Sequence, residues 1–277
     1  MVQSTKQGNG TMKAARGRCL RMSGVWVPPV AISGTEVKFT CHYETSPSLN
    51  DTLYSLKWYR GHDQFYEYIP RNIPPMKVYE SAHVHVDSSI HFIQLSPLPQ
   101  KSQSDANTVV LKGVTRETSG SFQCEVVGDK PLFETDNYTK NMTVVDIPPW
   151  GPRLTHRPLS SKVGVQDIIQ ARCEVGPSDP PTEITWTINR APAPPYARVK
   201  TYRNENRVHV SDLHIQVTED LFYKGELVVA CGAKLLSAFD KTANVTFVDV
   251  NAPEPAGYGW LSAGILITDL ILFSQKL

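Results

Sequence analysis

Short segments in which apolar and polar residues alternate recur along the chain, and they predict an all-β protein. Val37–Tyr43 reads V-K-F-T-C-H-Y, with Val37, Phe39 and Cys41 on one side. Successive side chains of a strand point to opposite faces of a sheet, so this segment is expected to bury one face. No window carries a sustained apolar stripe at helical spacing, which argues against helix. Further strands of the first half are expected at Thr52–Tyr59, Phe65–Ile69, Thr108–Val114, Ser119–Val126 and Tyr138–Val145.

The second half of the chain repeats this organisation after a proline-rich joint. The joint, Asp146–Pro152, reads D-I-P-P-W-G-P, and prolines at this density predict a stiff, extended connection. A chain of 277 residues is long enough for about two domains. We therefore expect one domain over residues 25–146, a linker over 147–151 and a second domain over 152–250. Strands of the second domain are expected at Asp167–Cys173, Glu183–Ile188 and Glu226–Cys231.

Four of the five cysteines form two widely separated pairs, and each pair encloses a tryptophan. The members of the pairs are 83 and 58 residues apart, and Trp58 and Trp186 follow the first cysteine of each. This Cys…Trp…Cys arrangement is typical of an immunoglobulin sandwich. The longer separation leaves room for two extra strands, so the first domain is predicted to be variable-type and the second constant-type. The cysteines expected to form disulfides are Cys41, Cys124, Cys173 and Cys231.

Composition gives no sign of an enzyme, a cofactor or a nucleic-acid partner. The formal net charge is +1 and charged residues make up 20% of the chain, so no strong field attracts a polyanion to the chain as a whole. No nucleophile elbow, phosphate-binding glycine loop or zinc-binding helix motif is present. His83 and His85 share a face of a strand-like segment, with His91 nearby. These three histidines could bind a metal, although such histidines are more often solvated, and we expect no metal site.

Residues 1–24 are basic, lack acidic residues and are expected to be unstructured. They contain no apolar core of a signal peptide. This conflicts with the predicted disulfides, which need an oxidising compartment. An organelle-targeting segment or an incomplete N-terminus would explain this, and Cys19 is interpreted as a spare thiol. The segment Ser81–Asn107 begins like a strand and continues as a polar, proline- and serine-rich stretch, Ser96–Asp105, which is expected to be a long mobile loop.

Residues 251–277 form a small polar spacer followed by the apolar run Trp260–Phe273. A membrane span needs about 20 apolar residues, and Asp269 interrupts this shorter run. A terminal apolar segment after a short spacer is typical of a signal for a lipid (GPI) anchor, with Asn251 or Ala252 as the attachment site. The alternatives are a short membrane span, or a segment that is neither a span nor an anchor signal.

Glycosylation signals of the N-x-[ST] type indicate an extracellular protein. One lies in the basic N-terminus, at Asn9, and the others are interpreted as lying at strand ends or loops of the two sandwiches. The expected glycosylation sites are Asn50, Asn137, Asn141 and Asn244.

The outward face of the first domain is the candidate binding surface. With Trp58 in the core, alternation places Leu56 and Tyr54 inward, and Ser55, Lys57 and Tyr59 outward. The next strand offers three aromatic rings, of which at least one set is expected to face out. Aromatic and charged side chains on a flat sheet are typical of a protein-binding face, although the rings could instead pack on the linker, on the long loop or on one another. The expected contact residues are Lys57, Tyr59, Phe65, Tyr66, Tyr68, Gln123, Glu125 and Phe133.

Four stretches also carry a resemblance to a known family. N-D-T-L-Y-S-L-K-W-Y-R-G, F-Y-E-Y-I-P, S-G-S-F-Q-C-E-V and P-L-F-E-T resemble the beaten path family of insect neuronal surface proteins, over about Leu20–Val250. The resemblance implies two tandem immunoglobulin domains, secreted or tethered to a membrane. It also implies binding of the first domain to sidestep-type immunoglobulin surface proteins, in axon guidance and synaptic partner choice.

Two other functions remain open at this point. The first is a homophilic adhesion molecule or another receptor ectodomain of the immunoglobulin type, because that fold hosts many functions. The second is a hydrolase or metal-dependent enzyme built on a sandwich, which would need a bound metal or a measurable activity.

Overall fold

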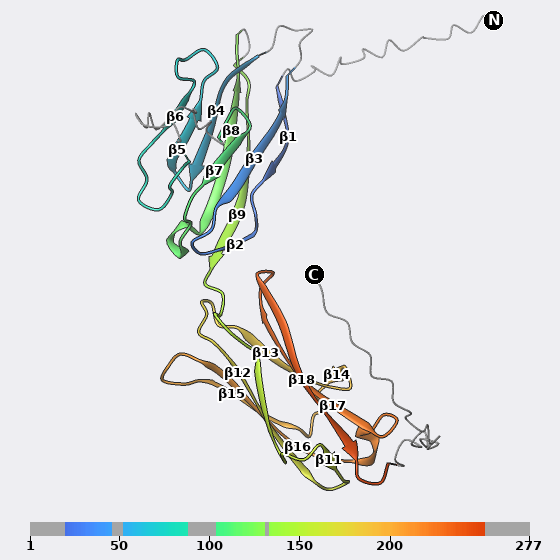
Figure 1. The fold of residues 1–277 in the computed structure, drawn as a ribbon. Helices are drawn as coiled ribbons and strands as arrows, with labels where there is room; N and C mark the ends of the chain where they lie inside the picture. Colours follow the sequence, from blue (N-terminus) through green and yellow to red (C-terminus); the bar gives the residue numbers. More distant parts are fainter. Residues whose placement is uncertain (1–19, 46–51, 88–103, 131–132, 253–277) are drawn as a thin grey trace, which may run out of the picture.

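The chain folds into two β-sandwiches that follow one another along the sequence (Figure 1). The computed structural model describes residues 20–45, 52–87, 104–130 and 133–252. Within these ranges every helical segment is a single 3-10 turn, Arg116–Thr118 and Glu219–Leu221. None of the described helices is long and apolar enough to span a membrane. The all-β architecture with two tandem immunoglobulin-like sandwiches, predicted from the sequence, is confirmed.

The first sandwich pairs a three-stranded sheet with a six-stranded one. The smaller sheet has the order β1-β3-β7, from β1 (Arg21–Trp26), β3 (Val37–Glu44) and β7 (Thr108–Leu111). The larger sheet has the order β2-β9-β8-β4-β5-β6. Its strands are β2 (Val30–Ile32), β4 (Leu53–Arg60), β5 (Asp63–Tyr68), β6 (Met76–Val78), β8 (Gly120–Gly128) and β9 (Thr135–Val145). The two extra strands β5 and β6 extend this sheet as in a variable-type domain.

Aromatic rings and a disulfide fill the space between these sheets. Cys41 and Cys124 are joined, with their Cα atoms 6.4 Å apart, as the sequence predicted. Trp58 packs against Phe39 at a ring-centroid distance of 5.4 Å, and Phe122 meets Phe39 edge-on at 4.7 Å. Burial of such rings supplies much of a domain's stability. This cluster therefore packs the six-stranded sheet against the three-stranded sheet.

The first sandwich begins earlier than residue 25, where the sequence analysis placed its start. β1 starts at Arg21, and both Leu20 and Met22 are buried in the core. The Met22 N–H donates to Oδ2 of Asp136 at 3.0 Å, which ties this edge strand to β9 through a side chain. Residues 20–24, which were expected to be unstructured, therefore belong to the first sandwich.

The second sandwich pairs a four-stranded sheet with a five-stranded one. The first has the order β10-β12-β16-β15, and the second β11-β18-β17-β13-β14. Because β15 pairs with β16 instead of extending the other sheet, the arrangement is constant-type, with the two-residue strands β11 and β14 added. The strands are β10 (Arg153–Arg157), β11 (Lys162–Val163), β12 (Ile168–Val175), β13 (Glu183–Ile188), β14 (Ala191–Pro192), β15 (Arg198–Arg203), β16 (His209–Gln216), β17 (Glu226–Leu235) and β18 (Phe239–Asp249).

The core of the second sandwich repeats the plan of the first with one polar addition. Cys173 and Cys231 are joined, with their Cα atoms 6.3 Å apart, which confirms the second predicted disulfide. Trp186 is buried beside them, and its Nε1–H donates to Oγ of Ser211 at 2.9 Å. A buried indole N–H usually finds such a partner, and this hydrogen bond fixes the orientation of the Trp186 ring.

Apolar packing and backbone hydrogen bonds connect the two sandwiches. Asp146 and Asp179 donate their N–H groups to each other's carbonyl oxygens, at 2.8 and 3.1 Å. Arg116 of the first domain forms an ion pair with the Asp179 carboxylate. Beside them lies a buried cluster to which both domains contribute, formed by Val145, Val175, Ala233, Leu235 and Phe239.

Several features predicted from the sequence lie outside the described residues. They are Asn9, Cys19, Asn50, His91, most of Ser96–Asp105 and the apolar run Trp260–Phe273. The strand-like first part of Ser81–Asn107 is described as far as Asp87, and it forms one isolated bridge, between Val86 and Leu111.

Candidate recognition face of the first domain

One register row crosses five strands on the face of the six-stranded sheet that is turned away from the core, here called the outer face. Glu125 of β8 lies opposite Lys57 of β4, Lys57 opposite Glu67 of β5, and Glu67 opposite Lys77 of β6. At the other end, Asn137 of β9 lies opposite Glu125. Residues in register share a face, and the buried Trp58 and Cys124 alternate with them. We call Glu125, Lys57, Glu67 and Lys77 the charged row.

The charges alternate in sign along this row and compensate one another. Nζ of Lys57 lies 4.0 Å from Oε1 of Glu67 and 4.0 Å from Oε1 of Glu125. The side chains of Lys57, Glu125 and Glu67 are 27%, 25% and 15% exposed. Opposite charges on neighbouring strands stabilise a sheet modestly, and partial burial restricts their freedom. The row is therefore an ordered polar surface that a partner can still reach.

Tyr59 lies one row further along the outer face and is linked to the charged row. Its hydroxyl donates to Oε1 of Glu125 at 3.3 Å. Partial burial, and then the neighbouring Glu125 carboxylate, raise the pKa of Tyr59 to about 12. The phenol therefore stays protonated and acts as a donor at physiological pH. Gln123 and Gln64 flank Tyr59 in register on either side.

Tyr79 forms the corresponding contact on the β6 side. Its hydroxyl donates to Oε2 of Glu67 at 2.6 Å, and this hydrogen bond is the main reason that the pKa of Tyr79 is raised. Nζ of Lys77 lies 4.6 Å from the centre of the Tyr79 ring, a cation–π distance. Two tyrosines thus orient the two carboxylates of the charged row from opposite sides.

Phe65 and Tyr66 point into the core, although the sequence analysis placed them among the contact residues. Tyr66 lies opposite Trp58, whereas Gln64 lies opposite Tyr59, so Phe65 is an extra residue in a β-bulge. A bulge places two residues of one strand opposite one of its neighbour. Both rings are consequently 0% exposed. The expectation that one aromatic set of β5 must face out assumed unbroken alternation, and it was wrong.

The remaining aromatics of this region also differ from the expected orientation. Tyr68 lies opposite Leu56 and packs partly buried against the core. Tyr54, expected inside, is 42% exposed, because the register between β4 and β8 shifts between Leu53 and Ser55. Ser55 is 1% exposed although it was expected on the surface.

Phe133 is exposed as predicted, but it lies beyond the end of the charged row. It precedes β9, is 48% exposed, and meets Tyr54 edge-on at a ring-centroid distance of 6.1 Å. Of the predicted contact residues, the outer face therefore brings together Lys57, Tyr59, Gln123 and Glu125, and it leaves Phe133 at the sheet end.

The glycosylation signals that the structure describes lie inside strands, which corrects the interpretation that they occupy strand ends or loops. Asn137 and Asn141 belong to β9, opposite Glu125 and Ser121, and both are exposed on the outer face. Asn244 belongs to β18, opposite Ala230, and is also exposed. Over Asn137–Asn141 β9 pairs with β8 alone, since β2 joins it only from Thr143 onward. This edge position leaves room for a glycan.

Sequence reasoning missed three members of the polar surface: Glu67, Lys77 and Tyr79. Lys57 and Glu67 carry opposite charges at positions that a hairpin brings together, which was a usable signal. The bulge at Phe65 hid it, because the bulge changes which β5 residues share a face with Lys57. In the described part of the chain no cluster of His, Cys, Asp and Glu is arranged to hold a metal ion, and His83 and His85 are exposed.

Comparison with known proteins gives structural likenesses only. No protein-family model matches the chain, and no curated protein matches it. Among solved structures, Rst D1-D2 is 11% identical over 84% of this chain and 100% of its own, with a TM-score of 0.41. Immunoglobulin domains 1–5 of Sidekick-1 are 12% identical over 84% of this chain and 39% of their own, with a TM-score of 0.42. Bovine butyrophilin is 14% identical over 80% of this chain and 97% of its own, with a TM-score of 0.44. At TM-scores below 0.5, these likenesses carry no argument about function.

Proposed function

We propose that this protein is a non-enzymatic recognition protein of the cell surface or the extracellular space. Its outer face docks reversibly onto an immunoglobulin domain of another surface protein. The resemblance to the beaten path family suggests a sidestep-type partner and a role in axon guidance and synaptic partner choice. Two disulfides and the glycosylation signals agree with an oxidising, extracellular setting.

The observation that carries this proposal is the charged row with its two tyrosines. Lys57 is held between Glu67 and Glu125, and Tyr59 and Tyr79 hold the two carboxylates. A surface whose side chains are ordered before binding loses less conformational entropy when the partner arrives. Complementary charge on the partner then supplies specificity and fast association more than raw affinity.

A glycan at Asn137 would limit which part of the outer face a partner can reach. Asn137 lies opposite Glu125 at the β9 end of the row, whereas the other end is formed by Glu67 and Lys77. The proposed contact is therefore centred on β4, β5 and β6. A single sheet-to-sheet contact of modest area is expected to bind with a dissociation constant on the order of 1–100 μM, strengthened by clustering on membranes.

A binding screen tests the proposal. The full chain, secreted behind a cleavable signal peptide and displayed as a multimer, is offered to a panel of immunoglobulin-family surface proteins that includes the chain itself. Binding to a sidestep-type protein that is lost in Lys57→Glu and retained in Lys38→Glu would support it. Lys38 is a matched control because it is exposed on β3 of the other sheet. Absence of any partner for a folded, glycosylated product would refute it.

Homophilic adhesion is a second candidate, and the charged row itself favours it. Read from β8 to β6, the signs of Glu125, Lys57, Glu67 and Lys77 run minus, plus, minus, plus. Two copies related by a two-fold axis that reverses the row would place Glu125 opposite Lys77, and Lys57 opposite Glu67. A two-fold interface requires such a self-complementary surface.

Charge-swap variants distinguish the two candidates. If the protein is homophilic, Lys57→Glu and Glu67→Lys each abolish self-association, and a mixture of the two variants restores it. If it is heterophilic, sedimentation velocity shows monomers of the wild-type protein at concentrations at which the foreign partner binds.

A further inference from the structure

The second domain carries a row of basic and hydrogen-bonding side chains on the outward face of its four-stranded sheet. Arg157 of β10 lies opposite Gln170 of β12, Gln170 opposite His214 of β16, and His214 opposite Arg198 of β15. We call these four residues the basic row. The buried Ala171 and Leu213 alternate with Gln170 and His214, so the row points away from the core. No acidic residue interrupts it.

The neighbouring register row adds two more cations and one acid. It runs Thr155, Arg172, Asp212 and Lys200 across the same strands. Arg172 donates from Nε and from its terminal nitrogen to the two carboxylate oxygens of Asp212, at 2.7 and 3.2 Å. This bidentate pair raises the pKa of Arg172, and it leaves no carboxylate oxygen of Asp212 without a hydrogen bond.

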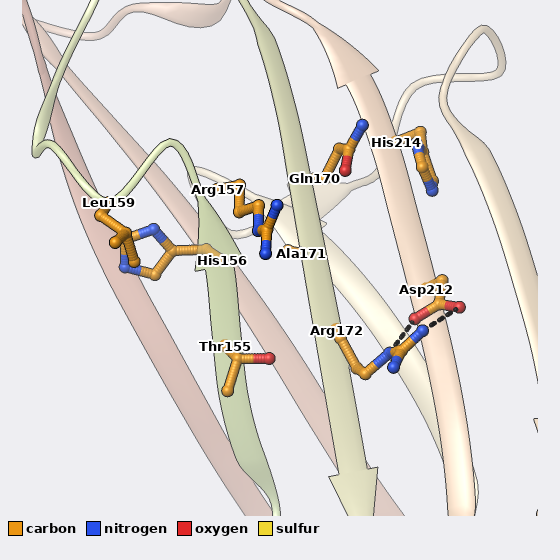
Figure 2. Close-up of a pocket in the computed structure, with 9 residues that line it drawn as sticks. All are labelled: Thr155, His156, Arg157, Leu159, Gln170, Ala171, Arg172, Asp212 and His214. Carbon is orange, nitrogen blue, oxygen red and sulfur yellow. Dashed lines mark hydrogen bonds and ion pairs between the residues drawn. The ribbon is translucent and has the colours of Figure 1, made fainter.

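Side chains from three of the four strands, β10, β12 and β16, line a hollow on this sheet face (Figure 2). Arg157, Gln170 and His214 lie along one level of the view, and Thr155, Arg172 and Asp212 along the next. The hollow is lined by these six residues together with His156, Leu159 and Ala171. The ion pair of this face joins Arg172 to Asp212. Neither Arg157 nor Arg198 takes part in an ion pair within the described part of the chain.

We propose that this face of the second domain binds a sulfated polysaccharide of the glycosaminoglycan type. The two rows carry the cations Arg157, Arg198, Arg172 and Lys200 against the single acid Asp212. Four strands span about 14 Å, at about 4.8 Å between neighbours. Arginine forks recognise planar or tetrahedral oxyanions with paired hydrogen bonds, and Gln170, Thr155 and His214 add groups suited to hydroxyls. A linear chain with repeated sulfates lying across the strands would meet Arg157 and Arg198 at the two edges.

The position of the cations favours a polysaccharide over a lipid surface. They lie along a sheet face, and two of them, Arg157 and Arg172, line a hollow, whereas a flat membrane is contacted by cations that project together from one convex side. The acid Asp212 lies in the middle of the face, where it would approach a uniform sheet of anionic headgroups. A single anionic chain can instead lie with its sulfates on the flanking arginines.

Heparin serves as the probe, with the full chain and immobilised heparin. Arg157→Gln with Arg198→Gln is expected to weaken binding at least about tenfold and to make the affinity less dependent on salt, because fewer counterions are released. The matched control is Lys38→Gln with Lys140→Gln, which removes the same charge from exposed positions of the first domain. All variants keep the basic N-terminal residues, so any binding by that segment is common to them. Melting temperatures are compared first, to show that each variant folds.

Each outcome decides the proposal. A selective loss in Arg157→Gln/Arg198→Gln, with little binding to fully desulfated heparin, supports it. Equal losses in both double variants would mean nonspecific attraction and would overturn it, as would unchanged binding in both. Binding to phosphatidylserine vesicles in place of heparin, lost in the Arg157 and Arg198 variant, would assign the face to membranes and equally overturn it.

Discussion

Asn137 and Glu125 lie directly opposite each other on the outer face of the first domain, across the β8–β9 pair. A glycan on Asn137 would therefore stand beside a carboxylate of the charged row. Asn141 lies opposite Ser121, two strand repeats away from the row. Under the proposed function, Asn137→Gln is expected to strengthen partner binding by about threefold, less than 1 kcal/mol, by removing steric cover. Asn141→Gln is expected to have less effect.

Mass spectrometry of the secreted protein checks that both sites carry glycan, and biolayer interferometry measures the affinities. A weaker complex after Asn137→Gln would contradict the shielding role, because the sugar would then be part of the contact.

Reversal of the charge at Lys57 should disrupt the face without unfolding the domain. Lys57→Glu places a third carboxylate between those of Glu67 and Glu125. In the wild type, Oε1 of each glutamate lies 4.0 Å from Nζ of Lys57. Partner affinity is expected to fall at least tenfold, about 1.4 kcal/mol. The partly exposed position limits the loss of folding free energy to about 1 kcal/mol. Urea unfolding separates the two effects, and a loss of several kcal/mol in stability would mean that Lys57 is a structural residue.

Phe65 and Phe133 offer a direct test of the β-bulge. Phe65→Ala is expected to cost about 3–5 kcal/mol of folding free energy, because it opens a cavity in the core. Phe133→Ala, at an exposed position, is expected to stay within about 0.5 kcal/mol of the wild type. Chemical denaturation of the two variants measures both. Similar stabilities would show that Phe65 faces solvent, as its place among the expected contact residues implied.

His209 should make the second domain less stable in mild acid. Burial, followed by the positive charges of Arg203 and Arg207, lowers its pKa below the ordinary value of 6.5, while the contact with Ser178 acts in the opposite direction. Above pH 6.5 the imidazole is neutral in both states. As the pH falls below 6.5, the unfolded chain binds a proton before the folded domain does, so folding stability decreases until the folded pKa is passed.

Thermal melts of the wild type and of His209→Gln between pH 7.5 and 4.5 measure this contribution. The variant is expected to lose less stability over the upper part of that range. Identical pH profiles would show that groups other than His209 cause any loss of stability in mild acid.

The sequence was sufficient for the fold because its strongest signals are local and repeated. Alternation over Val37–Tyr43 and Glu183–Ile188, with one tryptophan between two cysteines in each half, fixes which faces are buried. These patterns follow from the two-residue period of a strand, which any half-buried sheet imposes. Both disulfides and both sandwich types could therefore be predicted.

The candidate site was harder to predict, because it depends on register. One extra residue at Phe65 turns Tyr66 inward and brings Glu67 opposite Lys57, and nothing in the local composition marks the position of a bulge. Tyr54 and Ser55 exchanged their expected exposure for the same reason, at the shift after Leu53. The contacts of Tyr79 and Lys77 arise between neighbouring strands, so alternation within one strand does not reveal them.

The junction between the sandwiches has a mechanical consequence. Asp146 and Asp179 are hydrogen-bonded in both directions, Arg116 is paired with Asp179, and apolar side chains of both domains are buried beside them. Tension applied to the first domain by a bound neighbour would load these contacts together with the peptide chain of the linker. These contacts would resist bending between the two sandwiches. A force applied at the outer face of the first domain would then be transmitted to the opposite end of the second domain, with little extension of the linker.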